Sequence, residues 1–299
     1  MNIAVIGSNN VDLITYINRM PGEGETIEAP DFALGCGGKG ANQAVAASRL
    51  GSKVLMVSRV GNDIFADNTL DNFRKNGIGD RYILRTEATS GVAPIFVDGD
   101  GKNSIIIVQG ANALLSPADL ESARDAIAEC SLIVLQLEIA LETVYAAIDL
   151  GAELGIPVLL NPAPAHPELS LDRVKGVDFI VPNETELSLL TGMPVESKED
   201  ISNAAQVLLK LGIKNVIVTV GQRGALWVSA AGSQLLEGQS VQAVDTSGAG
   251  DAFIGCFSHF FVQTGDIAGS LAKANKYAAD SVTKRGTQTS YAHAGDLDL

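Results

Sequence analysis

Val244-Asp245-Thr246-Ser247-Gly248-Ala249-Gly250-Asp251 is a glycine-rich approach to an apolar stretch, residues 252–261. The apolar residues of that stretch recur at helical spacing, so a helix is predicted to begin near Gly250. The unpaired N–H groups and the dipole at the start of a helix suit a phosphate in transfer, and glycines let the backbone approach it closely. Asp251 is therefore a candidate catalytic base that accepts a hydroxyl proton, although an Asp at this position also fits an ordinary helix cap.

Outward from this turn, short apolar runs alternate with helical segments along the chain. Buried strands are predicted at residues 3–6, 54–60, 132–135, 158–160, 179–181 and 216–220. Helices are predicted between them, at residues 41–50, 64–76, 117–129, 141–154, 184–191 and 201–211. This order predicts an α/β fold whose mainly parallel central sheet is covered by helices on both faces.

Two regions interrupt the alternation. Residues 16–34 are rich in Gly, Pro and Thr, and residues 91–108 have the pattern of two strands around Asp98-Gly99-Asp100-Gly101. We expect these regions to form a small separate sheet. Strands beside a glycine-rich site suit a lid that closes over a substrate and excludes water. A flap that joins two copies of the chain is the alternative, and the two roles are compatible.

The composition is typical of a globular protein that acts on a small molecule. Of the 299 residues, 46% are hydrophobic and 19% charged, and 21 basic against 35 acidic side chains give a formal net charge of −14. This charge disfavours a nucleic-acid partner, whose binding rests on neutralising phosphates. An anionic nucleotide would have to be held by local features, such as backbone N–H groups, Lys39 and a magnesium ion.

The cysteines are Cys36, Cys130 and Cys256, an odd number without a C-x-x-C pair. Neither a disulfide framework nor a zinc cluster is predicted. Residues 1–7 are too short and uncharged for a signal peptide, and no apolar run approaches membrane-spanning length. We therefore expect a cytoplasmic location and no membrane partner.

A second glycine-rich segment, Gly35-Cys36-Gly37-Gly38-Lys39-Gly40, formally matches the G-x-G-x-x-G pattern of dinucleotide-binding proteins. That fingerprint should directly follow the first strand, whereas the strand at residues 3–6 ends well upstream, and the segment is no Walker A motif either. It is instead predicted to be a turn that feeds the helix at 41–50, with Lys39 and Asn42 near the start of that helix. A ligand site and a tight turn needed for packing both explain it.

Polar side chains follow two of the predicted strands. Asn10 and Asp12 come after the first strand, and Glu138 comes after the strand at 132–135. The carboxyl edge of an open α/β sheet is where ligands bind, and an amide with carboxylates suits sugar hydroxyls. An ordinary turn stabilised by Asn10 or Asp12 remains the alternative.

Asn183 and Glu186 lie three residues apart at the start of a predicted helix. They can share one face and reach a hydrated metal or phosphate, or they can form a capping box. Thr219-Val220-Gly221-Gln222-Arg223-Gly224 ends a buried strand in a glycine-bracketed turn, which offers backbone groups to a nucleotide or forms a simple hairpin.

Taken together, these features resemble the ribokinase-like, or PfkB-type, carbohydrate kinases. Two signatures carry the resemblance, Gly35-Cys36-Gly37-Gly38-Lys39-Gly40-Ala41-Asn42-Gln43-Ala44 and Asp245-Thr246-Ser247-Gly248-Ala249-Gly250-Asp251-Ala252-Phe253, and the likeness spans residues 2–290. The resemblance implies a Rossmann-like three-layer α/β/α domain with a small β-sheet lid, dependence on ATP and Mg²⁺, and phosphorylation of a sugar's terminal hydroxyl. In this view residues 1–299 form one kinase unit, with the lid drawn from about 13–36 and 91–110.

The resemblance also assigns roles to individual residues. Asp251 would deprotonate the sugar hydroxyl, and the γ-phosphate would lie in an anion hole formed by Gly248, Ala249 and Gly250. The sugar would be held, together with Asp251, by Asn10, Asp12, Gly38, Lys39, Asn42 and Glu138. The nucleotide site would be lined by Asn183, Thr219, Gly221, Gly224, Gly250 and Asn275. Glu186 would act through hydrated Mg²⁺, and a monovalent cation, usually K⁺, would lie near Asp245, Ser247, Ser281, Lys284, Gly286 and Ser290.

The expected reaction is transfer of the γ-phosphate of ATP to the 5-hydroxyl of D-ribose, giving D-ribose 5-phosphate and ADP. A 2-deoxyribose kinase has the same chemistry, and Asn10 discriminates between the two if it bonds a hydroxyl near C2. A non-catalytic sugar sensor and a nicotinamide-dependent dehydrogenase are two further candidate functions; the intact Asp251 signature disfavours the first, and only the misplaced glycine fingerprint supports the second. A homodimer through the lid sheet is also expected.

Overall fold

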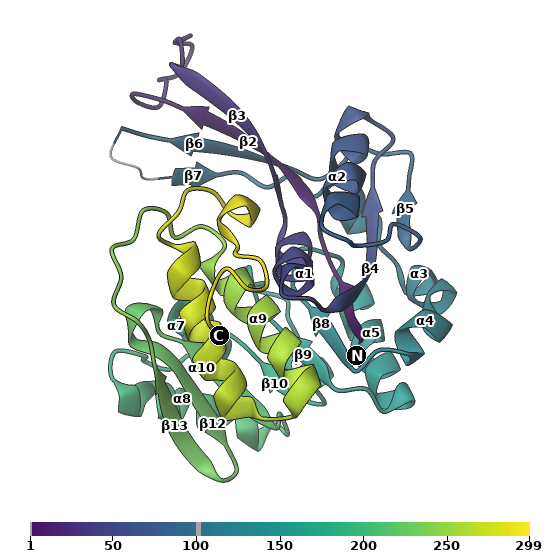
Figure 1. The fold of residues 1–299 in the computed structure, drawn as a ribbon, viewed down its shortest axis with the longest axis vertical. Helices are drawn as coiled ribbons and strands as arrows, with labels where there is room; N and C mark the ends of the chain where they lie inside the picture. The colour runs from purple at the N-terminus through teal and green to yellow at the C-terminus, as the bar shows by residue number, and fades with distance from the viewer. Residues whose placement is uncertain (1, 100–102) are drawn as a thin grey trace.

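Within residues 2–99 and 103–299, which the computed structural model describes, nine strands form one sheet in the order β13-β12-β11-β10-β9-β8-β1-β4-β5 (Figure 1). The strands are β1 Asn2–Ile6, β4 Lys53–Val60, β5 Ile83–Arg85, β8 Leu132–Leu135, β9 Val158–Leu160, β10 Phe179–Ile180, β11 Asn215–Thr219, β12 Gly224–Ser229 and β13 Gly232–Glu237. β4, β5 and β8 to β11 join β1 in a parallel arrangement, whereas β12 and β13 add an antiparallel edge. The predicted mainly parallel sheet is confirmed.

Helices cover both faces of this sheet. Their bounds are α1 Lys39–Arg49, α2 Ile64–Lys75, α3 Pro117–Ser122, α4 Arg124–Ala128, α5 Leu141–Leu154, α6 Leu171–Val174, α7 Glu184–Thr191, α8 Lys198–Lys210, α9 Ala249–Thr264 and α10 Ile267–Ser281, with short 3-10 turns η1 Gly110–Leu114, η2 Gly221–Arg223 and η3 Gln288–Ser290. Alternate side chains of β1 point to opposite faces. Ile3 and Val5 belong to the hydrophobic cluster that includes α1, α9 and α10, and Ala4 and Ile6 belong to the cluster that includes α5 and α8. None of the described helices is both long and apolar enough to cross a membrane.

A second, four-stranded sheet projects from one end of the large domain (Figure 1). Its order is β3-β2-β6-β7, with β2 Asn10–Tyr16, β3 Asp31–Gly37, β6 Val92–Val97 and β7 Asn103–Ile105. Both interrupting regions of the sequence contribute to it, as expected. The turn predicted around residues 98–101 lies partly outside the described residues, and β2 begins at Asn10, six residues before the region that the sequence singled out.

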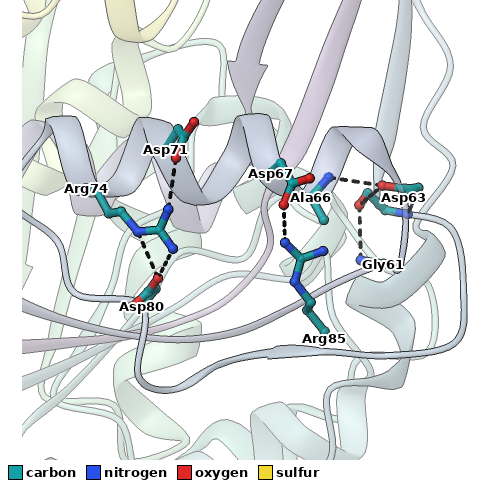
Figure 2. A network of polar contacts seen from close by, with 9 residues as sticks. Gly61, Asp63, Ala66, Asp67, Asp71, Arg74, Asp80 and Arg85 are labelled. Carbon is teal, nitrogen blue, oxygen red and sulfur yellow. Dashed lines mark hydrogen bonds and ion pairs between the residues drawn. The ribbon is translucent and has the colours of Figure 1, made fainter.

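Helix α2 lies beside strands β2 and β3 of this second sheet. Asp63 caps it by accepting a hydrogen bond from the Ala66 amide at 3.0 Å, and ion pairs hold it to the segment that returns to β5 (Figure 2). The helix is joined to that segment by Arg74–Asp80 at 2.6 Å and to β5 by Arg85–Asp67, whereas the pair Arg74–Asp71 at 2.9 Å lies within the helix. Exposed pairs of this kind contribute at most about 1 kcal/mol each. The same helix carries Asn72, whose Nδ2 donates to Gln288 Oε1 at 2.8 Å.

Candidate active site

Asp251 lies in the first turn of α9, with its side chain only 6% exposed. Its Oδ1 accepts a hydrogen bond from Gln43 Nε2, and its Oδ2 accepts one from Asn42 Nδ2, each at 2.9 Å. Both donors belong to α1, so the carboxylate joins two helices instead of capping its own. Each carboxylate oxygen can accept more than one hydrogen bond, which leaves room for a ligand hydroxyl.

The turn ahead of Asp251 is shaped for close approach of an anion. Gly248 has a left-handed backbone with φ of 71° and precedes α9 without a side-chain cap. The amides of Gly250 and Asp251 have no acceptor among the described residues, as is usual in the first turn of a helix. Tyr291 Oη donates to the Gly248 carbonyl at 2.9 Å and so fixes the turn from behind.

The glycine-rich turn before α1 packs directly against residues 7–10. A Cβ at Gly40 would lie 2.7 Å from the Ser8 amide nitrogen, and one at Gly38, where φ is +87°, would lie 2.8 Å from the Asn10 nitrogen. Glycine is required at both positions. The packing explanation is therefore correct, and the same close packing brings Lys39 and Asn42 to Asp251.

Lys39 lies among the charges of three carboxylates, those of Asp251, Glu138 and Glu186. Glu138 Oε2 accepts hydrogen bonds from Ser8 Oγ at 2.6 Å and from the Lys39 amide at 2.9 Å. Burial, with the nearby charges of Glu138 and Asp251, raises the pKa of Asp12 to about 7. Burial alone would lower the pKa of the Lys39 ammonium, but the surrounding carboxylates outweigh it and raise that pKa. The cluster can bind several hydroxyls through oppositely charged groups.

Asn10 is held by a residue that the sequence did not single out. Asn112, in η1, donates from Nδ2 to Asn10 Oδ1 at 2.9 Å and to the Asn9 carbonyl at 2.8 Å, while its own Oδ1 accepts from the Asn9 amide at 3.0 Å. A Cβ at Gly91 would lie 2.2 Å from Asn112 Nδ2 and 2.3 Å from Asn10 Oδ1, so only glycine leaves space for this pair. The side-chain nitrogen of Asn10, Nδ2, has no protein acceptor among the described residues and is available to a ligand oxygen.

Two adjoining cavities meet at the turn before α9. The smaller, about 190 Å³, is lined by Lys39, Asn183, Glu186 and residues 248–251. The larger, about 430 Å³, contains every residue expected at the nucleotide: Asn183, Thr219, Gly221, Gly224, Gly250 and Asn275. Asn10, Asp12 and Glu138 line neither cavity. Glu138 accepts from the Lys39 amide, and the charge of Asp12 interacts with those of Glu138 and Asp251. The backbone of Asn10 packs against Gly38, next to Lys39.

Asn183 and Glu186 form a capping box at the start of α7. Asn183 Oδ1 accepts from the Glu186 amide at 2.8 Å, and Glu186 Oε2 accepts from the Asn183 amide at 2.9 Å. Glu186 nevertheless lines the smaller cavity, and burial is the main cause that raises the pKa of its carboxyl. Among the described residues no three His, Cys, Asp or Glu side chains lie close enough to hold a metal ion. Glu186, which lines this cavity, is a carboxylate that could contact a hydrated Mg²⁺ through water.

The residues expected at a monovalent cation lie on two segments that Asp245 connects, the loop before α9 and the stretch from the end of α10 to η3. Its carboxylate accepts hydrogen bonds from the amides of Ser247 and Gly286, both at 2.9 Å. The carbonyls of Asp245, Ser247 and Gly286 accept no hydrogen bond from the described residues, which suits a hard cation. The side chains of Ser281, Lys284 and Ser290 instead bond within their own segment. The hydroxyls of Ser281 and Ser290 act there as donors and keep their lone pairs, so their hydroxyl and carbonyl oxygens could both contribute to a cation site. Lys284 could contribute only its carbonyl.

The sequence did not identify four residues that contact the site: Ser8, Gln43, Asn112 and Tyr291. Ser8 follows the first strand as Asn10 does, and Gln43 stands next to Asn42, so position alone could have indicated both. Asn112 and Tyr291 carry no local signal, because their partners lie 102 and 43 residues away in the chain.

Comparisons with known proteins show the family to which the chain belongs. The model of the pfkB family of carbohydrate kinases matches residues 1–294. The deoxyribokinase of Salmonella typhi is 58% identical over 292 residues, covering 97% of this chain and 95% of that protein. The ribokinase of Mus musculus is 36% identical over 302 residues, covering 99% of this chain and 94% of that protein. The structure of Arabidopsis thaliana ribokinase complexed with ribose and ATP matches with a TM-score of 0.90 at 32% identity, covering 98% of this chain and 96% of that one.

Proposed function

Because the chain belongs to the pfkB family of carbohydrate kinases, we propose that it transfers the γ-phosphate of ATP to the 5-hydroxyl of D-ribose, releasing D-ribose 5-phosphate and ADP. The reaction class follows from the family and its relatives: the chain is a sugar kinase, a phosphotransferase with an alcohol group as acceptor, and the family uses ATP. The choice of ribose and the roles of individual residues are the proposal.

In the proposed mechanism, Asp251 accepts the proton of the sugar hydroxyl that attacks the γ-phosphate. The free amides at the start of α9, with Gly248 and Ala249 in the same turn, stabilise the charge on the transferred group, and Lys39 adds a positive charge. The carboxylate is held on both oxygens, so little reorganisation is needed when the sugar binds. Mg²⁺ held through water by Glu186 would neutralise phosphate charge.

The roles proposed for the remaining residues follow their places in the structure. Asp12, Glu138, Lys39 and Asn42 surround the sugar, while the larger cavity accommodates the nucleotide. The open carbonyls of Asp245, Ser247 and Gly286 support a K⁺ site that orders the turn before Asp251. The second sheet acts as a lid, because Asp12 and Asn10 project from its strand β2.

Asn10 carries the proposal that the sugar is ribose. Asn112 occupies the Asn10 oxygen, so Asn10 presents an N–H donor to the sugar. Such a donor suits a hydroxyl oxygen near C2, and a sugar that lacks this hydroxyl leaves a buried donor unpaired. The relative named deoxyribokinase makes 2-deoxyribose the second candidate.

A sugar panel tests the substrate. We expect kcat/KM to favour ribose over 2-deoxyribose in the wild type, and Asn10→Met to lower this ratio by roughly 10-fold or more, because the lost hydrogen bond is buried. ADP release is measured with each sugar, ATP and Mg²⁺, with and without K⁺. A ratio that Asn10→Met leaves unchanged contradicts the role of Asn10, a wild type that prefers 2-deoxyribose selects the second candidate, and no ADP release with any sugar would favour a sensor.

A further inference from the structure

A chain of hydrogen-bonded side chains runs from Arg49, at the end of α1, to the carboxylate of Asp251. Each member donates to the next: Arg49 Nε to Asn76 Oδ1 at 2.8 Å, Asn76 Nδ2 to Asn72 Oδ1 at 3.3 Å, Asn72 Nδ2 to Gln288 Oε1 at 2.8 Å, Gln288 Nε2 to Asn42 Oδ1 at 3.0 Å, and Asn42 Nδ2 to Asp251 Oδ2 at 2.9 Å. The last three members are only about 5–6% exposed. The chain joins α1, α2, η3 and α9.

The two ends of this chain fix its direction. A guanidinium has donors and no acceptor, and an ionised carboxylate has acceptors and no donor. Each amide between them has one accepting oxygen and one donating NH₂ group, so a single orientation of all four satisfies every bond. Turning Asn42 over would place its oxygen against Asp251 and its NH₂ against the NH₂ of Gln288. Such mismatches are costly in a buried site.

A separate pair of amides fixes the other carboxylate oxygen. Gln136 Nε2 donates to Gln43 Oε1 at 2.7 Å, and Gln43 Nε2 donates to Asp251 Oδ1 at 2.9 Å. The plane of the carboxylate is therefore defined by two donors that are each oriented by a further amide. Removing the support of one donor lets the carboxylate rotate about the bond to its Cβ.

We propose that Gln288 is a positioning residue for catalysis: it orients the Asn42 amide so that Asn42 holds the Asp251 carboxylate in the plane needed to take the hydroxyl proton. The inference rests on the proposed function, in which Asp251 is the base. Gln288 is well placed for this task, because Arg49 also donates to the backbone carbonyls of Gln288 and Tyr291 and so anchors the segment that carries it.

Two substitutions at Gln288 separate orientation from packing. Gln288→Met keeps the approximate volume but removes donor and acceptor, so Asn42 loses its orienting partner. Gln288→Glu replaces the donor by a second acceptor, which competes with Asp251 for the Asn42 NH₂ group. We expect the single-turnover rate of sugar phosphorylation to fall about 10-fold in Gln288→Met and about 10-fold further in Gln288→Glu, with KM for ATP unchanged.

Matched variants guard against a general loss of structure. Gln263→Met makes the same exchange on α9, where Gln263 bonds His259 and lies outside the chain, and it should keep the wild-type rate. Asn72→Asp replaces the NH₂ group that donates to Gln288 by an acceptor, one member further from Asp251 than Gln288 itself. This acceptor should reverse the Gln288 amide, so we expect Asn72→Asp to phosphorylate the sugar more slowly than Asn72→Ala. Because both Asn72 variants keep Gln288, the order of their rates tests the proposal even if the Gln288 variants fail to fold.

The rates are measured by rapid quench per active site and compared with Asp251→Asn, which should lose roughly 10²- to 10⁴-fold as a removed general base does. A wild-type rate in Gln288→Met, or a rate in Gln288→Glu no lower than in Gln288→Met, would overturn the positioning role alone. Near-normal turnover in Asp251→Asn would instead overturn the proposed function on which the inference rests.

Discussion

Asp12, which we propose to bind sugar hydroxyls, has a pKa close to neutrality. Burial is the main cause that raises this pKa from 3.8 to about 7, and Glu138 and Asp251 add to it. An acid whose folded-state pKa is raised makes folding less favourable as the pH rises from its unfolded pKa toward its folded one, because the unfolded chain ionises in this range while the folded protein keeps the proton. Sugar hydroxyls can offset that cost by donating to the ionised carboxylate.

Sugar binding should therefore release a proton from Asp12 at about pH 6, where the free protein holds it mostly protonated. Affinity for the sugar should rise as the pH increases from about 6 to 8 for the same reason. Calorimetric titration with ribose in buffers of different ionisation enthalpy measures the proton released. Asp12→Asn should release none. Wild-type binding without net proton exchange at this pH contradicts the assignment.

Residues were predictable from the sequence where a local motif marks them, even when their partners are distant: those of Asp251 lie 208 and 209 residues away. Asp251 and Lys39 each lie next to a glycine-rich turn, a local pattern that indicates a ligand site. Asn112 and Gln288 were not, because they act on Asn10 and Asn42 across 102 and 246 residues and have no motif of their own. The assignment of Glu186 was ambiguous for another reason: one carboxylate forms the capping box and also lines the cavity.

Elements were predictable where the pattern is long and its ends are marked. The predicted bounds of α5 and α7 match the structure, and both helices end at a left-handed glycine, Gly155 and Gly192. The single helix expected at 117–129 is wrong, because the backbone leaves helical geometry at Ala123 and separates α3 from α4. The start of β2 was missed because Asn10 and Asp12 disfavour strands in isolation, while pairing with β3 and β6 imposes one.

The crossing of α1 and α9 positions both donors of Asp251 and depends on Gly255. A Cβ there would lie 2.5 Å from the Cβ of Ala46 and 2.7 Å from the carbonyl oxygen of Gln43. We expect Gly255→Ala to lower the free energy of unfolding by about 1–3 kcal/mol, because overpacking outweighs the gain in helix propensity of about 1 kcal/mol. Urea denaturation measures the loss. Gly176→Ala is the control, because a Cβ added at Gly176 would meet no atom within 4 Å. A Gly255→Ala protein as stable as the wild type would contradict the prediction.

At the scale of the whole molecule, the second sheet has two unlike faces. Side chains alternate along β2, and paired residues of neighbouring strands share a face. Asp12 faces the carboxylates of the site, so Leu13, Leu34, Phe32 and Phe96 lie on the opposite, outer face. On that face Phe32 is 54% and Leu34 60% exposed. The sequence predicted the sheet but not this division, which depends on the register between strands far apart in the chain.

An exposed apolar face of this kind is typical of an interaction surface, and we expect two copies of the chain to pair through it. Sedimentation equilibrium should show a dimer for the wild type and a shift toward monomer for Leu34→Lys, since each copy would bury a charge in the apolar contact. Leu189→Lys changes a side chain that is 67% exposed on α7, away from this sheet, and should leave the dimer intact. A wild type that remains monomeric at micromolar concentration, or a Leu34→Lys protein that dimerises as strongly as the control, would show that the outer face is not the contact.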